Sequence, residues 1–387
     1  MSVRLADLLE EFKAKPDPSV DEPEVLTLTE RNGFVRQSER FSKRLAVENT
    51  SNYKLLGRSD IAFNPYLLWA GAIAQNTQWD QAIISPLYPT FHVREGYCPE
   101  FVIRLLLTDQ MIKRYDGIAY GSVPRKRRTT VQDFLGLEVP DPPPLPEQRR
   151  IAAILDHADA LRAKRREAVA CLDELALSVF HDIFGDLSSY EVRRLSEISQ
   201  VTSGLTKGRR LSANASTRSV PYLAVVNVQD RRFELSQPKV ILATEQEIER
   251  YRLRRDDLLL TEGGDPDKLG RGSVWRDELP EAIHQNHIFK VRLSVPDISP
   301  VFLNWVISSA YGKAYFLRSA KQTTGIASIN SSQLKAFPVP VAARCQQERF
   351  ERHLAETVSA RDHALASVSA LDSLFSSLQS RAFRGAL

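Results

Sequence analysis

The sequence is poor in cysteine and has no apolar run of membrane length. Among its 387 residues it has only three cysteines: Cys98, Cys171 and Cys345. Their wide separation argues against a disulfide framework and favours a reducing compartment. The longest apolar region, Ile61–Ala74, is interrupted by Asn64 and Pro65 and falls short of the roughly 20 residues that a membrane-spanning helix needs. Because the N-terminal segment also lacks the apolar core of a signal peptide, we expect a cytoplasmic protein without membrane contact.

Motifs of a self-contained enzyme are also missing. The chain has no GxxxxGK[ST] phosphate-binding loop and no glycine-rich cofactor loop after a strand. Asn64-Pro65-Tyr66 and Asp141-Pro142-Pro143-Pro144 each miss the adenine methyltransferase motif [ND]PP[YFW] by one position and are typical of turns. His284 and His287 have no third ligand at metal-binding spacing. We therefore expect a non-catalytic chain without a metal or cofactor of its own.

What the sequence does contain is ordinary for a globular protein. The length predicts about two or three domains. Apolar residues make up 43% of the chain and charged residues 26%, both within the range of globular proteins. The formal net charge of +4 is mildly basic, which by itself is only a weak indication of a polyanionic partner.

The chain repeats one pattern in its two halves. A helical pattern that starts with Pro-Glu-Gln-Arg-Arg-Ile at 146–151 returns 199 residues later, from Gln346 onwards. The matched pairs at this offset are Ile151/Phe350, Leu155/Leu354, Arg162/Arg361, Val169/Val368, Leu172/Leu371, Asp173/Asp372, Leu175/Leu374 and Phe184/Phe383. A period of about half the chain indicates a tandem duplication rather than a solenoid, whose repeats are roughly 20–50 residues long.

Both repeated segments predict long helices. Apolar residues recur in them at alternating steps of four and three over about four heptads, which is the pattern of a coiled-coil seam. The residues expected to pack in this seam are Ile151, Leu155, Val169, Leu172, Phe350, Leu354, Val368 and Leu371. Arg162, Arg165 and Arg361 also fall in the seam, where they either set its register or lie with their charged ends at its edge.

Proline-rich sequence precedes each helix and fixes an extended chain there. We therefore expect rigid hinges at 139–148 and 337–347. Gly185 is suited to end the first helix in the left-handed conformation. The predicted division is a globular domain at 1–138, hinge and helix at 139–186, a second globular domain at 187–336, and hinge and helix at 337–387.

The two globular segments are predicted to be rich in β-structure, so the fold class is α+β. Short runs typical of strands are Val25–Thr29, Ile61–Phe63, Ala82–Ser85, Val220–Val228, Asp257–Thr261 and Ile288–Leu293. The segment from Tyr53 to Phe63 resembles the segment from Tyr251 to Leu260. We interpret this as two globular domains that share a frame and differ in detail.

Basic and short polar residues gather in loops at comparable places of both halves. Arginine and lysine on such loops suit phosphate contacts, and short polar side chains suit base edges. The candidates for DNA contact are Arg125, Lys126, Arg127, Arg128, Lys207, Arg209, Arg210, Arg271, Lys321, Thr323 and Thr324. The alternative is that these are ordinary solvated loops.

The hinge and helix elements resemble the repeated regions of specificity (S) subunits of type I restriction–modification systems. The family's helix-opening motif stands here as Pro143-Pro144-Leu145-Pro146-Glu147-Gln148. Segments 24–37, 53–65 and 83–93 look like one target recognition domain of that family. Segments 201–208, 220–228, 251–264 and 323–340 fit a second. The second hinge departs from the motif, with Val341-Ala342-Ala343-Arg344-Cys345-Gln346-Gln347 in its place.

The resemblance implies that each globular domain reads one half of a split sequence in double-stranded DNA. It also implies that the two helices pair as an antiparallel coiled coil, giving a pseudo-two-fold subunit whose helices fix the unread spacer. DNA-adenine methyltransferase (M) subunits, usually two, would dock on the helices, and motor-nuclease (R) subunits would join for cleavage. S-adenosylmethionine, ATP and Mg²⁺ would then belong to these partners.

Two other readings stay open at this point. A coiled-coil scaffold that binds only proteins would have the same helices, with its loop charges incidental. It predicts no sequence-selective DNA binding beside a methylating partner. A related modification or phage-defence system, which modifies DNA without restricting it, would use a similar chain.

Overall fold

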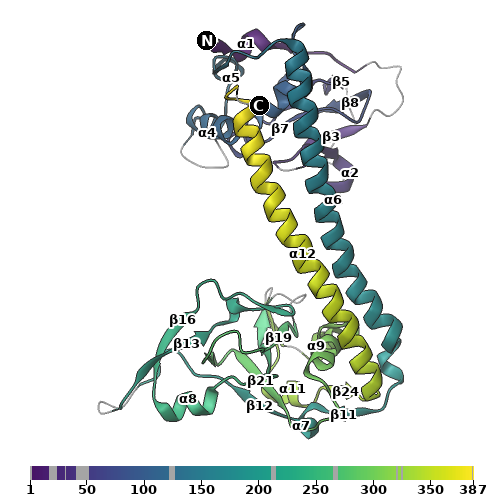
Figure 1. Ribbon diagram of the computed structural model, residues 1–387, viewed down its shortest axis with the longest axis vertical. Helices are drawn as coiled ribbons and strands as arrows, with labels where there is room; N and C mark the ends of the chain where they lie inside the picture. Colours follow the sequence, from purple (N-terminus) through teal and green to yellow (C-terminus); the bar gives the residue numbers. More distant parts are fainter. Residues whose placement is uncertain are drawn as a thin grey trace. The chain divides into compact units, whose positions relative to one another are not determined.

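The protein divides into two compact units that share two long helices. The computed structural model describes residues 2–16, 24–30, 32–40, 52–121, 127–210, 215–264, 269–319, 321–323, 326–385 and 387. Unit 1 comprises Met1–Ala168 and Ala364–Leu387, and unit 2 comprises Val169–His363. The helices α6 (Leu145–Phe184) and α12 (Arg344–Ala382) each contribute to both units (Figure 1). Mixed α and β structure, as predicted, is present throughout.

Unit 1 is built from short strands and helices around the start of α6. Its strands are β1 (Ser2–Arg4), β2 (Leu9–Phe12), β3 (Val25–Leu28), β4 (Phe34–Arg36), β5 (Lys54–Gly57), β6 (Ile61–Phe63), β7 (Ile73–Gln75), β8 (Gln81–Ile84), β9 (Thr90–Val93) and β10 (Glu138–Pro140). Its shorter helices are α1 (Leu5–Leu8), α2 (Gln37–Arg40), η1 (Leu68–Ala70), α3 (Pro99–Leu106), α4 (Asp109–Gly117) and α5 (Val131–Leu135). The sheets have the strand orders β1-β10, β2-β9-β6-β7 and β4-β3-β8-β5.

Unit 2 has the same kinds of element. Its strands are β11 (Val192–Arg194), β12 (Ser199–Ser203), β13 (Arg218–Leu223), β14 (Val228–Gln229), β15 (Arg232–Phe233), β16 (Lys239–Ala243), β17 (Leu258–Thr261), β18 (Gly263–Gly264), β19 (Gly272–Val274), β20 (Ile283–His284), β21 (Ile288–Leu293), β22 (Lys321–Thr323), β23 (Ile326–Ser328) and β24 (Pro338–Pro340). Its shorter helices are η3 (Leu187–Ser189), α7 (Leu195–Ile198), η4 (Val225–Asn227), α8 (Glu245–Tyr251), α9 (Pro300–Ser308), α10 (Ala310–Ser319) and α11 (Ser331–Lys335).

The sheets of unit 2 repeat the order and register of those in unit 1. The central sheet β12-β21-β17-β19 corresponds to β2-β9-β6-β7, and β11-β24 corresponds to β1-β10. In both units the third sheet contains one parallel pair, β3–β8 or β13–β20. Unit 2 also has the hairpin β14-β15 and the small sheet β18-β23-β22. The two globular frames therefore share these sheets, although the third sheet of unit 2 has no described counterpart of β5 and the loops differ.

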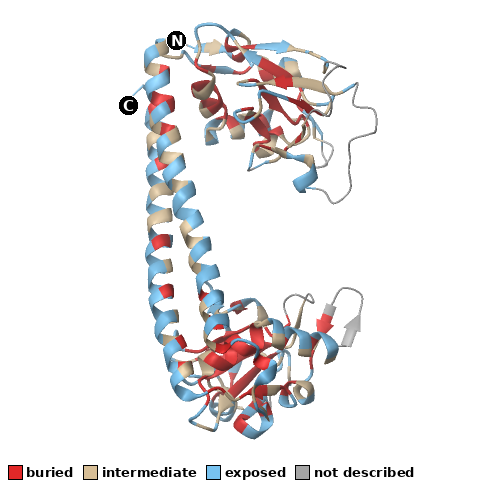
Figure 2. Cartoon of the chain, turned by 90° about the vertical axis from the view of Figure 1, so that its right-hand side faces the viewer, coloured by how far each residue is buried: buried red, intermediate tan, exposed pale blue. Residues whose placement is uncertain are grey.

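The ends of the long helices are buried in the cores of the units. In unit 1, Ile151 and Leu155 belong to a cluster that also includes Phe63, Phe91 and Phe134. In unit 2 the rings of Phe180, Phe184, Phe302, Trp305 and Phe350 pack together. Figure 2 shows buried residues near both ends of the helices, whereas none of the fully described residues 156–175 of α6 is buried. Aromatic burial at these ends fixes each helix to its globular part.

The proline-rich segments, predicted as hinges, contain strands of two-stranded sheets. Glu138–Pro140 forms β10 and pairs with β1, and Pro338–Pro340 forms β24 and pairs with β11. Proline is tolerated here because each sheet has only two strands, so both are edge strands. These pairs tie the start of each globular domain to the start of a long helix. Gly185 follows α6 with φ +57°, the left-handed conformation predicted for it.

Two equivalent ion pairs join the long helices. In unit 1, Arg162 Nε donates to Asp372 Oδ1 at 2.6 Å. In unit 2, Arg361 Nη1 donates to Asp173 Oδ1 at 3.3 Å. The second pair is the first one displaced by 199 residues, with the two helices exchanged. These arginines therefore bond across the helices rather than only extending to solvent.

Candidate nucleic-acid interface

In each unit, the same two loops are held together at one end of the central sheet. The Thr129 amide donates to the Pro65 carbonyl at 2.9 Å in unit 1, and the Ile329 amide donates to the Glu262 carbonyl at 2.9 Å in unit 2. Pro65 and Glu262 follow the equivalent strands β6 and β17, and Thr129 and Ile329 precede the equivalent helices α5 and α11. The frame thus presents one loop cluster per unit, built from segments distant in sequence.

A buried carboxylate supports the turn at the start of β6 and β17. Asp60 Oδ2 accepts from the Gly57 amide at 2.7 Å, and Asp257 Oδ2 accepts from the Arg254 amide at 2.8 Å. Burial raises the pKa of Asp60, although the hydrogen bonds from Gly57 and His92 oppose this. The preceding residues of both turns have positive φ, 70° at Ser59 and 71° at Asp256. These local bonds fix the direction in which the strand enters the loop cluster.

The partner of this carboxylate differs between the units. Asp60 bonds His92 Nδ1 at 2.7 Å, and the ring of His92 stacks on Phe12 with 3.8 Å between centroids. Asp257 instead accepts two bonds of 2.7 Å from Arg292. The carboxylate at this corner is therefore held by a two-bond ion pair with arginine in unit 2 and by one bond to a histidine ring in unit 1.

The loop cluster of unit 1 combines arginines with aromatic rings. The Arg127 guanidinium bonds Asp116 and lies 5.5 Å from the ring centroid of Trp69. Arg128 lies 5.9 Å from the ring of Tyr66 and is exposed. Arginine over an aromatic face gains cation–π attraction and loses side-chain freedom. Arg127 is therefore committed to internal bonds, whereas Arg128 remains available at the surface.

The loop cluster of unit 2 is polar rather than aromatic. His287 Nδ1 bonds Glu262 Oε2 at 2.6 Å, and both residues lie beside the small sheet β18-β23-β22. Arg271, on the turn before β19, donates from Nη1 to Gln229 Oε1 at 3.2 Å. The Arg271 carbonyl accepts from the Thr261 amide at 3.0 Å, which places this arginine's backbone next to the end of β17.

The remaining predicted DNA-contacting residues have three different environments. Arg209 is held by both carboxylate oxygens of Glu247 and by the Leu242 carbonyl at 3.0 Å, and it lowers the pKa of Glu247 to about 2. Lys207 and Arg210 are exposed on the loop after β12. Of Lys321 and Thr323 the structure describes only the backbone, as part of β22. Arg125, Lys126 and Thr324 lie outside the described residues.

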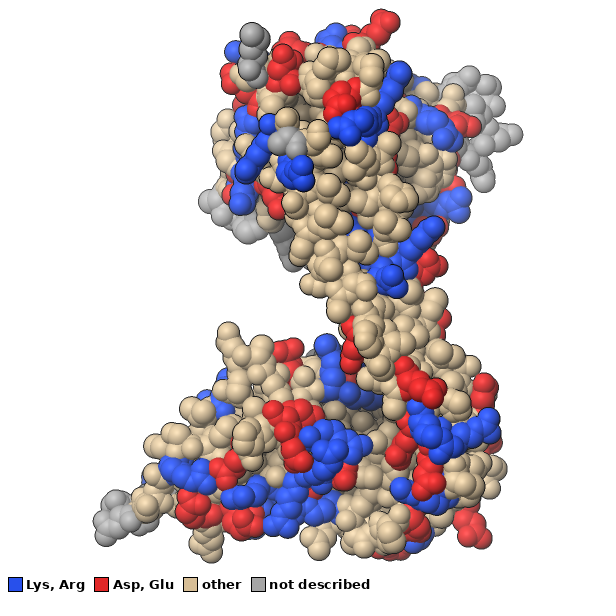
Figure 3. All heavy atoms as spheres, in the orientation of Figure 1, with Lys and Arg blue, Asp and Glu red and all other residues tan. Residues whose placement is uncertain are grey.

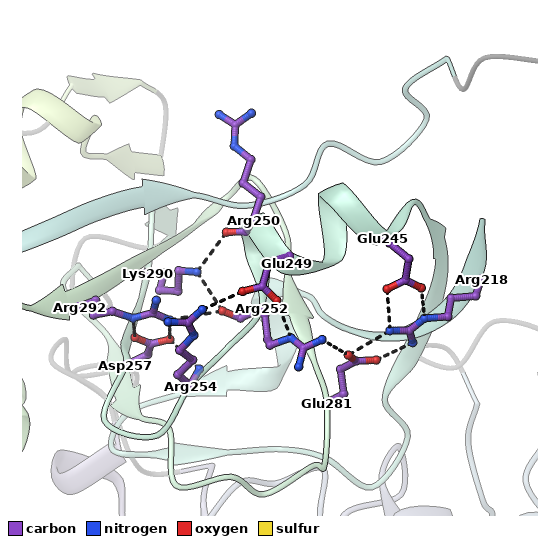
Figure 4. Close-up of polar contacts among 10 residues, drawn as sticks. All are labelled: Arg218, Glu245, Glu249, Arg250, Arg252, Arg254, Asp257, Glu281, Lys290 and Arg292. Atoms are coloured by element: carbon purple, nitrogen blue, oxygen red, sulfur yellow. Dashed lines mark hydrogen bonds and ion pairs between the residues drawn. The ribbon is translucent and has the colours of Figure 1, made fainter. Parts of the chain in front are cut away.

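Many arginines of unit 2 are neutralised by neighbouring carboxylates. Figure 4 shows Arg218 bonded to Glu245 and Glu281, with Arg252 also on Glu281 at 2.8 Å. Over the part of unit 2 visible in Figure 3, basic and acidic side chains are interspersed. Net charge alone therefore does not identify a binding face. What distinguishes the basic residues of the loops is whether a neighbouring carboxylate binds them.

Lys290 is the most deeply buried cation in this network. It lies in β21 and donates to the Arg252 carbonyl at 3.0 Å. Burial lowers its pKa to about 8, and the nearby Arg292 charge acts in the same direction. At its equivalent in unit 1, Thr90, the hydroxyl donates to the Phe12 carbonyl at 2.5 Å. Thr90 thus bonds a backbone carbonyl of the neighbouring strand β2, whereas Lys290 bonds a carbonyl at the end of α8.

The residues predicted to pair the helices are buried to different extents. Ile151, Leu155 and Phe350 are buried in the globular cores, whereas Val169, Leu172, Leu354, Val368 and Leu371 are half-buried. Several other apolar residues of the helices are at least 39% exposed: Leu161, Leu175, Leu177, Val358, Leu365 and Leu374. Apolar side chains of this kind mark a surface that another protein covers only where they form a contiguous patch.

Unit 2 also has a groove of about 710 Å³ beside the helices. Its lining includes Ala176 of α6, Trp305 of α9 and Val358 of α12. The guanidinium of Arg231 lies 3.7 Å from the Trp305 ring centroid and bonds Ser308. The groove has a mixed lining, with apolar residues of α6, α9 and α12 and charged residues that include Asp173, Arg276 and Arg361.

Among the described residues, no three histidine, cysteine or acidic residues gather as metal ligands would. Cys98, Cys171 and Cys345 are free thiols. No helix in the described part of the chain is long and apolar enough to cross a membrane.

Sequence reasoning missed several residues of the loop clusters. Glu262, Asn286 and His287 were not among the candidates for DNA contact, nor were Tyr66 and Trp69. The sequence signal that could have indicated them is their position shortly after or shortly before a predicted strand. The pairing of Glu262 with His287 could not be read from a separation of 25 residues.

The chain is similar in sequence to one curated protein of a named class. It is 22% identical over 168 residues to a putative type I restriction enzyme specificity subunit, MjaX, of Methanocaldococcus jannaschii. The match covers 43% of this chain and 39% of that protein, so this chain spans well under half of the relative's length. No protein-family model matches the chain.

Solved structures share the fold over nearly the whole chain. A chain from a structural study of complex assembly and conformational transition in a type I restriction–modification system has a TM-score of 0.60 and 16% identity, with 100% of this chain and 98% of that chain covered. The type I restriction–modification S subunit from M. genitalium has a TM-score of 0.56 and 13% identity, with 99% and 96% covered. The resemblance to type I specificity subunits that was stated from the sequence motifs is confirmed, and the fold is shared from end to end.

Proposed function

We propose that this chain, which has the fold of type I specificity subunits, is the DNA sequence-recognition subunit of a type I restriction–modification complex. Each globular unit reads one half-site of a bipartite target in double-stranded DNA. The observation that carries the proposal is the repetition of one frame with two different loop clusters. An equivalent frame orients each cluster in the same way, and different side chains on it suit two different half-sites.

The clusters support this function through their chemistry. Unit 1 has Arg128 exposed beside Tyr66, and unit 2 has Glu262 with His287. The exposed Lys207 lies two residues after Leu205, whose carbonyl accepts from the Asn286 amide at 3.1 Å. Arginine and lysine supply phosphate contacts and hence salt-dependent affinity. Polar side chains supply discrimination between bases, on the order of 1–3 kcal/mol for a good bidentate contact.

The long helices would set the spacer between half-sites and bind the partner subunits. In this proposal α6 and α12 pair antiparallel as a coiled coil that arose with the tandem duplication of the chain. The equivalent pairs Arg162–Asp372 and Arg361–Asp173 support that arrangement. Two DNA-adenine methyltransferase subunits would dock on the exposed apolar residues of the helices, and motor-nuclease subunits would join them.

The chain would supply no chemistry of its own. S-adenosylmethionine, ATP and Mg²⁺ would be bound by the partner subunits in the cytoplasm. This chain would bring the partner subunits to their target on the DNA by binding the DNA in one register.

Methylome sequencing tests the function directly. The chain is expressed in cells together with the methyltransferase encoded beside it, and methylated adenines are mapped with and without this chain. We expect a bipartite methylated motif that disappears when the chain is deleted. Unchanged methylation despite a stable complex would overturn the proposal and favour a protein-binding scaffold.

The basic loop of unit 1 offers a second test. Replacing residues 125–128 by alanine should weaken DNA binding of the assembled complex and reduce its dependence on salt, because fewer phosphates are neutralised. Arg127→Ala alone should act mainly on stability, since Arg127 bonds Asp116. Binding measured at several salt concentrations gives the slope. An unchanged slope in the fourfold variant would count against this loop.

A further inference from the structure

Three polar residues of unit 2 form one group at the edge of its loop cluster. Glu262 directly follows β17, while Asn286 and His287 directly precede β21. The Glu262 amide donates to the His287 carbonyl at 3.0 Å, which fixes the two backbones to each other. The side chains then meet again, with His287 Nδ1 at 2.6 Å from Glu262 Oε2. This group is held from two sides and presents its open side to solvent.

The hydrogen bond to Glu262 determines which nitrogen of His287 faces outward as an acceptor. A carboxylate can only accept, so Nδ1 must carry the proton of this bond. In the neutral imidazole, Nε2 then has the lone pair, and the Asn286 amide Nδ2 donates to it over 3.4 Å, a long contact that an incoming donor can replace. The His287 side chain is 56% exposed and that of Glu262 is 35% exposed, so Nε2 and the Glu262 carboxylate form an acceptor surface that a ligand can reach.

The frame does not need this group. The equivalents of Glu262 and His287 in unit 1 are Pro65 and Leu87, which occupy the same places beside β6 and β9. Leu87 is 60% exposed, so this corner folds with an apolar residue at the surface. A polar group that the fold can omit, at the loop cluster where the two units differ, points to a role in recognition.

The surroundings favour a nucleic acid as the ligand. The carbonyl of Glu262 accepts from the Ile329 amide, which joins this group to the segment after β23. Arg271 lies on the neighbouring turn, and the backbone of Lys321 lies in β22 of the adjacent small sheet. A cation such as Arg271 near an acceptor group is the arrangement expected where phosphates flank a base edge.

We propose that Glu262 and His287, positioned with Asn286, read an exocyclic amino group in the major groove, the N6 amino group of adenine or the N4 amino group of cytosine. Both amino groups are hydrogen-bond donors there, and a carboxylate accepts naturally from cytosine N4. This inference rests on the proposed function, because it assigns base-reading residues to unit 2. It implies that one position of one half-site depends on an amino group and that the other half-site does not depend on these residues.

The test uses the full chain in complex with its methyltransferase. Methylome sequencing first gives the wild-type motif. Duplexes carrying that motif are then changed one base at a time: adenine to purine, which lacks the N6 amino group, or cytosine to pyrimidin-2-one, which lacks the N4 amino group. We expect one such change in one half-site to weaken binding by about 5- to 140-fold.

Two variants connect that position to the residues. His287→Leu places in unit 2 the residue that unit 1 has, so the fold is expected to tolerate it, and Glu262→Gln removes the acceptor charge. Both should reduce the difference between the natural and the amino-lacking duplex, Glu262→Gln less completely because the glutamine amide oxygen still accepts. The matched control is Glu249→Gln. Glu249 lies on α8, is exposed and is paired with Arg254 at 2.8 Å. The control should leave the difference unchanged.

The outcomes separate this inference from the function itself. If wild type gives no bipartite motif, the proposed function fails. If the motif exists but both variants keep every amino-group preference, the function stands and this assignment is wrong. Loss of preference in the other half-site, or equal loss in Glu249→Gln, would also overturn it.

Discussion

The glutamine of the helix-opening motif has a structural role in both units. Gln148 Oε1 accepts from the amide of Cys98, the N-cap of α3, at 2.9 Å. Gln347 Oε1 accepts from the amide of Ser299, the N-cap of α9, at 2.8 Å. Both side chains are buried. The motif therefore attaches each long helix to the first helix of its globular core, and the departure of the second motif at 341–346 keeps this glutamine.

Replacing either glutamine by leucine should destabilise the protein. Gln148→Leu leaves the buried Cys98 amide without its acceptor, and Gln347→Leu does the same to Ser299. A buried donor left without a partner costs about 1–3 kcal/mol, so each variant should lose that much free energy of unfolding. Urea denaturation of the full chain measures it, with the exposed Gln132→Leu as the control. Equal stability of all three variants would contradict this role.

A buried histidine should make the stability of unit 2 depend on pH. His284 is fully buried in β20, and burial lowers its pKa to about 3 from an ordinary 6.5, with the Lys290 charge contributing. Between these two pH values the unfolded chain binds a proton that the folded chain does not. The free energy of unfolding should therefore fall as pH drops from about 6.5 towards about 3, by at most about 5 kcal/mol.

His284→Ile tests this dependence, because the equivalent residue in unit 1 is Ile84. The variant has no titrating group at this position, so its stability should change less between pH 6.5 and pH 4 than that of the wild type. Denaturant titrations at several pH values measure the slope. A slope identical to that of the wild type would show that other groups cause the acid sensitivity.

At the scale of the elements, the two equivalent ion pairs between the helices differ in strength. The Arg162 side chain is 17% exposed, bonds both Asp159 and Asp372, and lies 4.2 Å from the Phe375 ring centroid. The Arg361 side chain is 34% exposed and reaches Asp173 at 3.3 Å. Exposed ion pairs contribute about 0–1 kcal/mol, whereas partly buried charged hydrogen bonds contribute about 1.5–3 kcal/mol.

Arg162→Ala should therefore cost more free energy of unfolding than Arg361→Ala. We expect about 2 kcal/mol for the first, because packing on Phe375 is lost as well, and below about 1 kcal/mol for the second. Double-mutant cycles with Asp372→Asn and Asp173→Asn isolate the pairwise energies. A larger coupling energy for Arg361 with Asp173 would reverse this assignment.

The residues at which the globular part meets the long helix also differ between the two units. In unit 1, Arg104 of α3 pairs with Asp156 and Asp159 of α6 at 2.8 and 2.9 Å. At the equivalent sequence positions, unit 2 has Trp305 in α9 and Ala355 and Val358 in α12, and Trp305 and Val358 line the same groove. The three charged residues of unit 1 are thus all apolar in unit 2.

At the scale of the whole molecule, the proposed function implies that the length of the helices decides the spacing of the half-sites. One heptad lengthens a helix by about 10 Å, which is about three base pairs of B-DNA. Seven residues preserve the face on which the seam lies. Because the helices pair, the insertion must be made in both, after Ala168 and after His363, where each helix passes from one unit to the other.

The double insertion should lengthen the unread spacer by about three base pairs without changing either half-site. Methylome sequencing of cells that express the variant with its methyltransferase measures the spacer. An insertion in α6 alone is the control and should abolish methylation, because it displaces one helix against the other. A spacer that stays unchanged in the double variant would exclude the helices as its determinant.

The sequence by itself determined the elements whose cause is local. Heptad spacing predicted α6 and α12, whose observed starts and ends lie within a few residues of the expected ones, and alternating apolar runs predicted β6 and β21. The exception is Val220–Val228, predicted as one strand. It is divided at Ala224 because Asn227 Oδ1 accepts from the Ala224 amide and turns the chain. The repeat of 199 residues also predicted that the two globular domains share a frame.

Only the tertiary structure decided which side chains meet. Arg209 looked like its neighbours Lys207 and Arg210, yet it is bound by Glu247, 38 residues away. Glu262 and His287 showed no sequence signal of being a pair. The physical reason is that hydrogen bonds and ion pairs act over a few ångströms, so the charge left free at a loop depends on contacts that no local pattern encodes.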